Sequence, residues 1–281
     1  MNDVSLHAFQ PPLSSNQVMN FADANDSSSD LNNETFTLAS IDCGAWTPLR
    51  DMLDLMEVLI DIDLHAKIVQ PTVRQLQGGQ HLFLENAPVK FINVVRTGVF
   101  KVFRTSEGGY EQISGFMRRG DLLGFDGLLN GRHRTAAAAL QEASVFSIAL
   151  PDFYAFAQEF PSFDRGVMRA MAKAMVEMTK ISEMIAAPKA EVRLARFLLH
   201  VSGCMEGRGQ SPNSLHLEMT RREIGSYLGV AHETISRSFS VLTEAGIIEV
   251  EQRNVEIADL GALQRYARAG ATTHSVRQDP N

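Results

Sequence analysis

Four polar side chains recur at helical spacing near the C-terminal end of the chain, where they could hydrogen-bond to an extended partner. They are His232, Glu233, Ser236 and Arg237. Residues three and four apart are neighbours on a helix surface, so this spacing places the row on one face. Arginine pairs with O6 and N7 of guanine, and glutamate can accept a hydrogen bond from N4 of cytosine. Because phosphate otherwise repels a glutamate, its presence in the row favours contact with base edges.

The residues around this row predict two short helices joined by a turn. Thr220 can cap the first helix, and Glu223 three residues later completes a capping box. Gly229 suits the positive φ at which many helices end. A second helix with Ile235, Phe239 and Leu242 facing inward then gives a helix-turn-helix, and the residues up to Val250 predict a strand, as in a winged helix. The alternative is a helix pair that packs without contacting DNA. It is disfavoured because the capping box, the glycine turn and the polar row occur together.

A long helix is predicted over residues 161–187, from Pro161-Ser162 to the residue before Pro188. Its apolar side chains alternate by three and four residues, as in a coiled-coil seam. They are Met168, Met171, Met175, Met178 and Ile185, with Ser182 at one seam position. The alternative is a core stripe packed on the preceding region. A helix of about 25 residues extends ~37 Å, which is long for that purpose and favours a dimer seam.

The region from about 66 to 150 predicts many short strands. Apolar runs separated by glycine turns are typical of a β-sandwich or barrel. These runs cover 67–69, 81–84, 91–95, 99–103, 112–116 and 144–148. Gly108-Gly109 is the best hairpin candidate, because both glycines accept positive φ. A short helix is predicted over 47–61, and the polar residues 1–40 are expected to be a disordered tail.

The composition excludes several classes of function. The 281 residues carry a net charge of −7, so any contact with nucleic acid must come from a local face. Two distant cysteines, Cys43 and Cys204, form neither a zinc site nor a disulfide framework and suit a cytoplasmic compartment. Neither a membrane-spanning run nor a signal peptide is expected. The sequence shows no phosphate loop, nucleophile elbow or metal motif, so we expect no enzyme activity and no cofactor.

Three segments of the chain resemble the CRP/FNR family of bacterial regulators, especially its FNR branch. They are Gly120–Gly127, Glu191–Leu198 and, most specifically, Thr220–Arg237, and the resemblance spans about 47–265. It implies an α+β fold with an N-terminal β-roll (a cyclic-nucleotide-binding-like jelly roll), a long dimerisation helix and a C-terminal winged helix-turn-helix. The expected boundaries are a tail at 1–40, the β-roll at 41–160, the dimerisation helix at 161–187, the DNA-binding domain at 188–265 and a flexible tail at 266–281.

The resemblance also implies partners and site residues. Glu233, Ser236 and Arg237 match the residues that read bases in the FNR branch, where the half-site is TTGAT in a palindrome TTGAT-N4-ATCAA. A homodimer would present two such helices to adjacent major grooves. Contacts to the DNA backbone are expected from Thr220, Arg221, His232, Thr234 and Ser238. The turn Glu107–Glu111 is a candidate contact for RNA polymerase.

Two departures from the family limit what carries over. Only Cys43 lies where an FNR-type cluster would need its cysteines, and Phe146 stands near the position of the central one, so a four-cysteine iron–sulfur cluster is not expected. Arg134 and Thr135 form a candidate effector pocket, but the following alanines offer no polar partners, so nucleotide binding is disfavoured. His65 and His81 are weak candidates for haem. The alternative function is a ligand-binding β-barrel module that acts through protein contacts rather than DNA.

Overall fold

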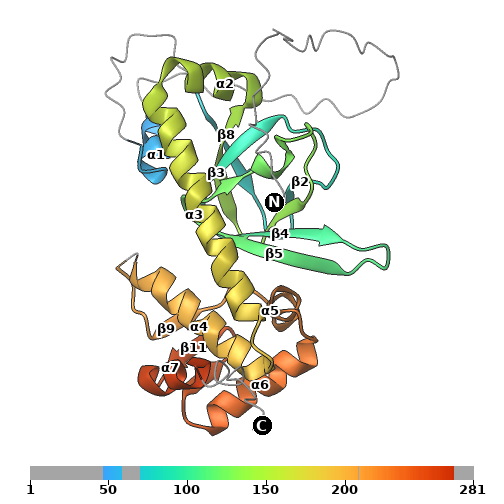
Figure 1. The fold of residues 1–281 in the computed structure, drawn as a ribbon, viewed down its shortest axis with the longest axis vertical. Helices are drawn as coiled ribbons and strands as arrows, with labels where there is room; N and C mark the ends of the chain where they lie inside the picture. Colours follow the sequence, from blue (N-terminus) through green and yellow to red (C-terminus); the bar gives the residue numbers. More distant parts are fainter. Residues whose placement is uncertain (1–46, 59–69, 208, 269–281) are drawn as a thin grey trace, which may run out of the picture. The chain divides into compact units, whose positions relative to one another are not determined.

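The computed structural model describes residues 47–58, 70–207 and 209–268 (Figure 1). The predicted tail 1–40, the predicted strand 67–69, His65 and Cys43 lie outside these ranges. Helix α1 spans Thr47–Leu55, shorter than the predicted 47–61. Its buried residues Leu49, Met52 and Leu53 pack in one cluster with Ile92 and Phe146, which explains the helical spacing of its apolar side chains.

Two antiparallel four-stranded sheets form the N-terminal domain. The first runs in the order β1 (Thr72–Leu76), β8 (Ala143–Ala149), β3 (Phe91–Thr97) and β6 (Leu122–Leu123). The second runs β2 (His81–Phe83), β7 (Ala136–Ala139), β4 (Phe100–Thr105) and β5 (Glu111–Met117). Buried residues from both sheets, including Val95, Phe100 and Val145, share one core cluster. The predicted β-roll is therefore confirmed.

Strand β7 shows how packing overrides propensity. It consists of four alanines, all buried, and pairs with both β2 and β4. Alanine is depleted in strands, so the run did not predict one. The strand lies between two neighbours and pairs with both, which gives its buried backbone hydrogen-bond partners on either edge.

The predicted Gly108-Gly109 hairpin joins β4 to β5. The amide of Ser106 donates to the carbonyl of Tyr110 and the amide of Gly109 donates to the carbonyl of Ser106, both at 2.9 Å. Of the two glycines only Gly109, with φ of 75°, occupies the left-handed region. The hairpin is confirmed with one positive-φ residue rather than two.

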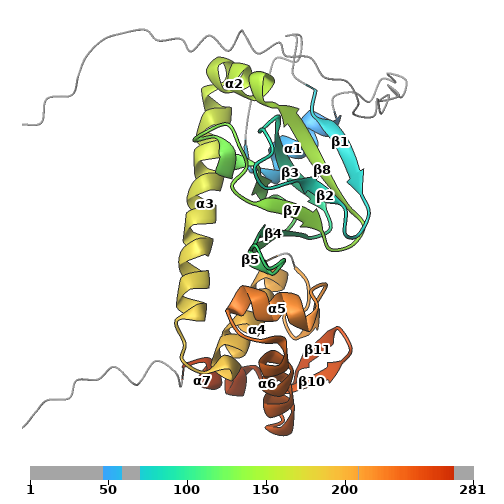
Figure 2. The same ribbon diagram turned by 90° about the vertical axis from the view of Figure 1, so that its right-hand side faces the viewer.

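Two helices follow the sheets. Helix α2 (Leu150–Glu159) was not predicted, and its buried Phe153 and Phe156 contact the ring of Phe163 at the start of the next helix. That helix, α3, spans Pro161–Ile185 with Pro161 in its first turn, as predicted. Figure 2 shows it as one uninterrupted helix, which ends before Pro188.

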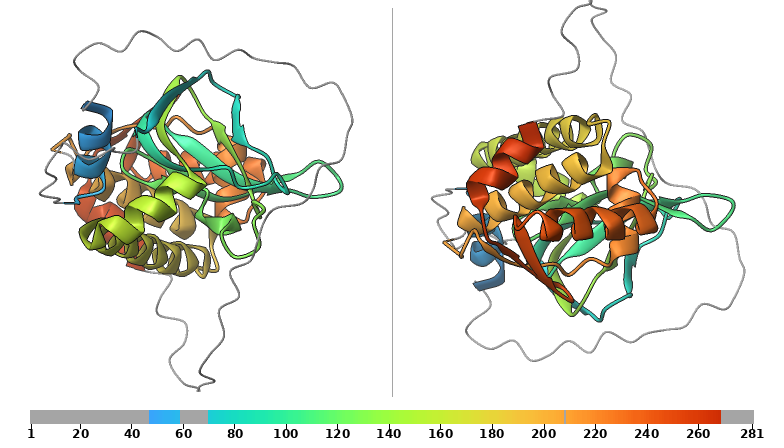
Figure 3. Two further views of the ribbon diagram at one scale, coloured as in Figure 1. Left: turned by 90° about the horizontal axis from the view of Figure 1, so that it is seen from above. Right: turned by 90° about the horizontal axis from the view of Figure 1, so that it is seen from below.

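The C-terminal domain combines short helices with a small sheet (Figure 3). In chain order it contains α4 (Ala190–Glu206), β9 (Ser214–His216), α5 (Arg221–Leu228), α6 (His232–Glu244), β10 (Ile248–Glu251), β11 (Asn254–Ile257) and α7 (Leu260–Arg268). The sheet order is β10-β11-β9. The antiparallel pair β10–β11 is the predicted wing. Helix α7 was not predicted, and it continues three residues beyond the expected limit at 265.

The architecture is thus α+β, with a β-roll, a long helix and a winged helix-turn-helix, as the sequence predicted. In the ranges 47–58, 70–207 and 209–268, none of the helices has the length and apolar character needed to cross a bilayer.

Candidate nucleic-acid interface

Helix α5 begins and ends as its sequence predicts. The Thr220 hydroxyl accepts a hydrogen bond from the amide of Glu223 at 3.2 Å, and the Glu223 carboxylate accepts one from the amide of Thr220 at 2.9 Å. This reciprocal pair is the predicted capping box. At the other end Gly229 has φ of 67°, a conformation that other residues adopt at a cost. Both ends of α5 are therefore set by local, sequence-encoded devices.

A second glycine in α5 permits a close approach that the sequence did not reveal. A Cβ on Gly225 would lie 2.8 Å from the carbonyl oxygen of Val230 and 3.4 Å from Cα of His232. The amide of Val230 also donates to the carbonyl of Gly225 at 2.9 Å. The turn between the two helices therefore crosses directly over a position where any side chain would collide with backbone.

Helix α6 divides into a buried face and an exposed face. Ile235, Phe239 and Leu242 are buried, as expected. Glu233, Ser236 and Arg237 are exposed, together with His232. The side chains of His232 and Glu233 each keep 58% of their surface accessible, with His232 Nδ1 3.3 Å from a Glu233 carboxylate oxygen. The structure therefore brings the four residues of the polar row together on the outer surface of α6.

The residues expected to contact the DNA backbone differ in how accessible their side chains are. Thr220 and His232 are exposed and Thr234 is half-buried. Arg221 lies over the ring of Phe239, 3.5 Å from its centre, and donates to the Gln252 carbonyl at 3.3 Å. Burial lowers the pKa of Arg221.

Ser238 is the clear correction within this set. It is only 4% exposed, and its hydroxyl donates to the Thr234 carbonyl at 2.8 Å. Because α6 turns this side chain inward beside Phe239, its hydroxyl is not presented to a phosphate. We therefore remove Ser238 from the expected backbone contacts.

Helix α5 also bonds to strand β5, a contact that sequence analysis missed. The Ser226 hydroxyl donates to the Glu111 carbonyl at 2.6 Å and accepts from the Ile113 amide at 2.9 Å. Lys101 lies 3.3 Å from a carboxylate oxygen of Glu223. In each of these contacts the α5 residue lies more than a hundred positions from its partner on the β4–β5 hairpin. Burial also raises the pKa of Tyr227, next to Ser226.

The predicted seam on α3 lies open in the single chain. Met168, Met171, Met175 and Met178 are 55%, 45%, 70% and 67% exposed. Ile185, the fifth predicted member, is half-buried. In the described chain the methionines do not form the core stripe that was the alternative interpretation. They leave α3 with an exposed apolar face.

The backbone donors of the candidate effector pocket are already engaged. The backbone amides of Arg134 and Thr135 both donate to the carboxylate of Asp126, at 2.8 and 2.9 Å. The Arg134 side chain is exposed. His81, one of the weak haem candidates, is exposed on β2. In the parts of the chain that the structure describes, no three metal-binding side chains converge.

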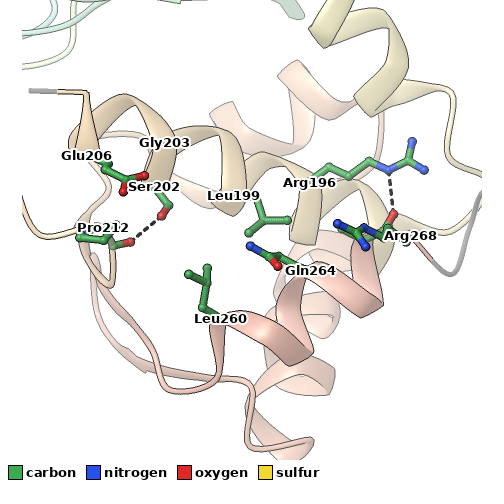
Figure 4. A pocket seen from close by; sticks show the side chains of 10 residues that line it. Arg196, Leu199, Ser202, Gly203, Glu206, Pro212, Leu260, Gln264 and Arg268 are labelled. Atoms are coloured by element: carbon green, nitrogen blue, oxygen red, sulfur yellow. Dashed lines mark hydrogen bonds between the residues drawn. The ribbon is translucent and has the colours of Figure 1, made fainter.

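A surface pocket of about 520 Å³ lies between α4 and α7 (Figure 4). Leu199 and Leu260 form its apolar side. Two of its polar side chains already have partners: Arg196 donates to the Ala267 carbonyl at 3.0 Å, and Ser202 donates to the Pro212 carbonyl at 2.6 Å. These bonds attach α7 and the loop before β9 to α4, so they support the position of the small sheet.

The fold and the exposed α6 row define a winged helix-turn-helix DNA-binding protein with an N-terminal β-roll. Comparison with known families agrees: residues 192–266 match the Crp-like helix-turn-helix domain, and residues 73–160 match the cyclic nucleotide-binding domain. The chain belongs to the CRP/FNR family of DNA-binding transcription regulators, which are not enzymes.

Relatives align over most of their length. The transcriptional activator protein Anr of Pseudomonas protegens is 34% identical over 214 residues, which are 76% of this chain and 86% of Anr. The fumarate and nitrate reduction regulatory protein of Escherichia coli is 33% identical, over 69% of this chain and 78% of that protein. The structure of FixK2 from Bradyrhizobium japonicum superposes with a TM-score of 0.63 at 25% identity, covering 70% of this chain and 96% of FixK2.

Proposed function

We propose that this regulator binds a palindrome of the form TTGAT-N4-ATCAA, with Glu233, Ser236 and Arg237 reading each half-site. The observation that supports this is the exposed row at the beginning of α6. A recognition helix presents its N-terminal residues to the major groove. The Arg237 guanidinium can pair with a guanine, and the Glu233 carboxylate can accept from a cytosine amino group.

The palindrome requires two copies of the reading helix, and α3 offers the surface for pairing. Its four exposed methionines follow the spacing of a coiled-coil seam. Exposed apolar patches of this kind mark association surfaces in soluble proteins. The proposed assembly is therefore a homodimer formed along α3.

Two further elements of the proposal concern regulation. These 281 residues contain two cysteines, and a cluster held by four of their thiolates would need twice that number. DNA binding is therefore proposed to proceed without such a cluster. For RNA polymerase we propose the tip of the β4–β5 hairpin, where Glu107 is exposed and Tyr110 is 44% exposed.

The experiment is a fluorescence-anisotropy titration of the full chain against the palindrome and against a DNA of equal length with both half-sites scrambled. Arg237→Ala is expected to weaken binding to the palindrome by about 1–3 kcal/mol and to relax the preference at one base pair. Binding to the scrambled DNA should change less, because that DNA lacks the base contact and is held by many phosphate contacts, of which one charge is a small part.

Arg265→Ala is the matched control. Arg265→Ala removes one positive charge, as Arg237→Ala does. Arg265 lies on α7 with 74% of its side chain accessible, outside the α6 row. Equal losses for the two variants would show a general electrostatic effect rather than base recognition. Wild-type affinity in Arg237→Ala would refute the assignment.

A further inference from the structure

The carboxylate of Asp126 accepts hydrogen bonds from Arg134 and Thr135, the two residues of the candidate effector pocket. Asp126 belongs to the short 3-10 helix η1 (Phe125–Gly127). One of its oxygens accepts three hydrogen bonds, from the amides of Arg134 and Thr135 at 2.8 and 2.9 Å and from the Thr135 hydroxyl at 2.8 Å. Successive backbone amides with a hydroxyl form the kind of donor set that binds phosphate and carboxylate oxygens.

The second oxygen of Asp126 faces a buried histidine. His133 Nδ1 lies 3.2 Å from it, and His133 is 3% exposed. The imidazole stacks on the ring of Phe83, with centres 3.8 Å apart and planes 7° apart. The His133 amide donates to the Ala87 carbonyl at 2.9 Å, and its carbonyl accepts from the Asn86 amide at 2.8 Å. His133, which directly precedes the two amide donors, is therefore held by its backbone as well as by its side chain.

The backbone is shaped to bring η1 against this segment. Gly124, at the start of η1, has φ of 99°. A Cβ at this position would lie 3.0 Å from the Phe91 carbonyl oxygen and 3.4 Å from Cε1 of His133. Glycine is the residue that accepts both the positive φ and the close approach. The approach of Asp126 to its donors is thus built into the local chain geometry.

Asp126 is held in its charged form. Burial alone would raise its pKa, but hydrogen bonds from His133 and Thr135 lower it by more, so the pKa of Asp126 lies below the usual value. A negative charge therefore occupies this donor set at neutral pH.

We infer that Asp126 is a built-in anion that fills the oxyanion-binding donors of the β-roll, so that a nucleotide phosphate is not accepted there. The family model that matches residues 73–160 is that of a cyclic nucleotide-binding domain. In this chain a ligand phosphate would meet a carboxylate that already holds the amides of Arg134 and Thr135. Two negative groups sharing one donor set disfavour each other's charged forms. The donors serve instead to attach residues 133–135 to η1.

The test is chemical rescue of the full-length protein. Asp126→Ala removes the anion, and formate offers a replacement that fits the same donors. The melting temperature of the variant is expected to fall by roughly 5–10 °C, because three charge-assisted hydrogen bonds are lost. Formate should restore part of that loss, relative to chloride at equal ionic strength. Glu142→Gln, which removes an exposed carboxylate, is the control and should behave like the wild type.

Two results would overturn the inference. One is an Asp126→Ala variant that melts like the wild type. The other is formate stabilising the wild type and Glu142→Gln as much as Asp126→Ala. If the alanine variant does not fold, Asp126→Asn replaces it, and an unchanged melting temperature in that variant would again refute the role of the charge.

A ligand titration of the wild type tests the inference without any variant. The probe is a fluorescent analogue of 3′,5′-cyclic AMP, added up to millimolar concentration. We expect no saturable binding, because the backbone amides of Arg134 and Thr135 and the Thr135 hydroxyl are already engaged by a carboxylate. Saturable binding would show that a phosphate can displace Asp126 and would overturn the inference.

Discussion

The glycine at position 225 allows two opposing effects to be separated. Replacing glycine by alanine inside a helix raises the free energy of unfolding by about 0.5–1 kcal/mol, because alanine lowers the backbone entropy of the unfolded chain and has the better helix propensity. At Gly225 the added methyl group would sit 2.8 Å from the carbonyl oxygen of Val230, a backbone atom that cannot rotate away. Overpacking of this kind costs about 1–3 kcal/mol. The collision should outweigh the gain.

Gly203 provides the matched control. It lies within α4, and a Cβ there would meet no heavy atom within 4 Å. Gly203→Ala should therefore raise stability by up to about 1 kcal/mol, whereas Gly225→Ala should lower it by up to about 2 kcal/mol. Because the helix-propensity gain is common to both, the difference between them measures the collision alone.

Urea unfolding of both variants provides the measurement, and DNA binding provides a second one. The residues displaced by a methyl group at 225 are Val230 and His232, at the start of α6. Gly225→Ala should therefore also weaken binding to the palindrome, although residue 225 is buried and touches no DNA in our proposal. Equal stabilisation by the two substitutions would refute the close approach of the turn to α5.

Two further predictions concern α3 and the β-roll. Met175→Glu should yield monomers in light scattering, because a dimer would bury two like charges in an apolar seam. Met175→Leu should remain dimeric. A glutamate variant that is still a dimer would refute the assignment of this face as the dimer seam. For Asp126 the folded-state pKa is lowered, so its contribution to stability is complete above the unfolded value of about 3.9 and is lost as the pH falls further. Urea midpoints should therefore decline more steeply in the wild type than in Asp126→Asn between about pH 5 and pH 2, and parallel curves would contradict this.

The helix-turn-helix could be predicted because its determinants are local. The capping box of Thr220 and Glu223 and the positive φ of Gly229 each depend on a few neighbouring residues. Strand β7 could not be predicted, because its alanines form a strand only between β2 and β4. Helix α2 was missed because its short run of aromatic residues lacks the length that separates a helix from a buried strand.

The site itself was predicted in part. Helical spacing was enough to place Glu233, Ser236 and Arg237 on the exposed side of α6. The same spacing did not show that Ser238 lies inside, next to Phe239. The contact of Ser226 with strand β5 joins residues 113 positions apart, and no local pattern encodes a partner at that distance. Asp126 and Thr135 are close in sequence, but their contact depends on the turn at Gly124.

The open face of α3 has a chemical property that leucines would not give it. Its four methionine side chains carry thioether sulfur and are 45% to 70% exposed, whereas Met184 on the same helix is 3% exposed. Peroxide converts a thioether to a polar, chiral sulfoxide, and dedicated reductases reverse the change. Peptide mass spectrometry of peroxide-treated protein should find Met175 oxidised before Met184. In the proposed dimer, pairing along α3 would then depend on the redox history of the protein as well as on its concentration.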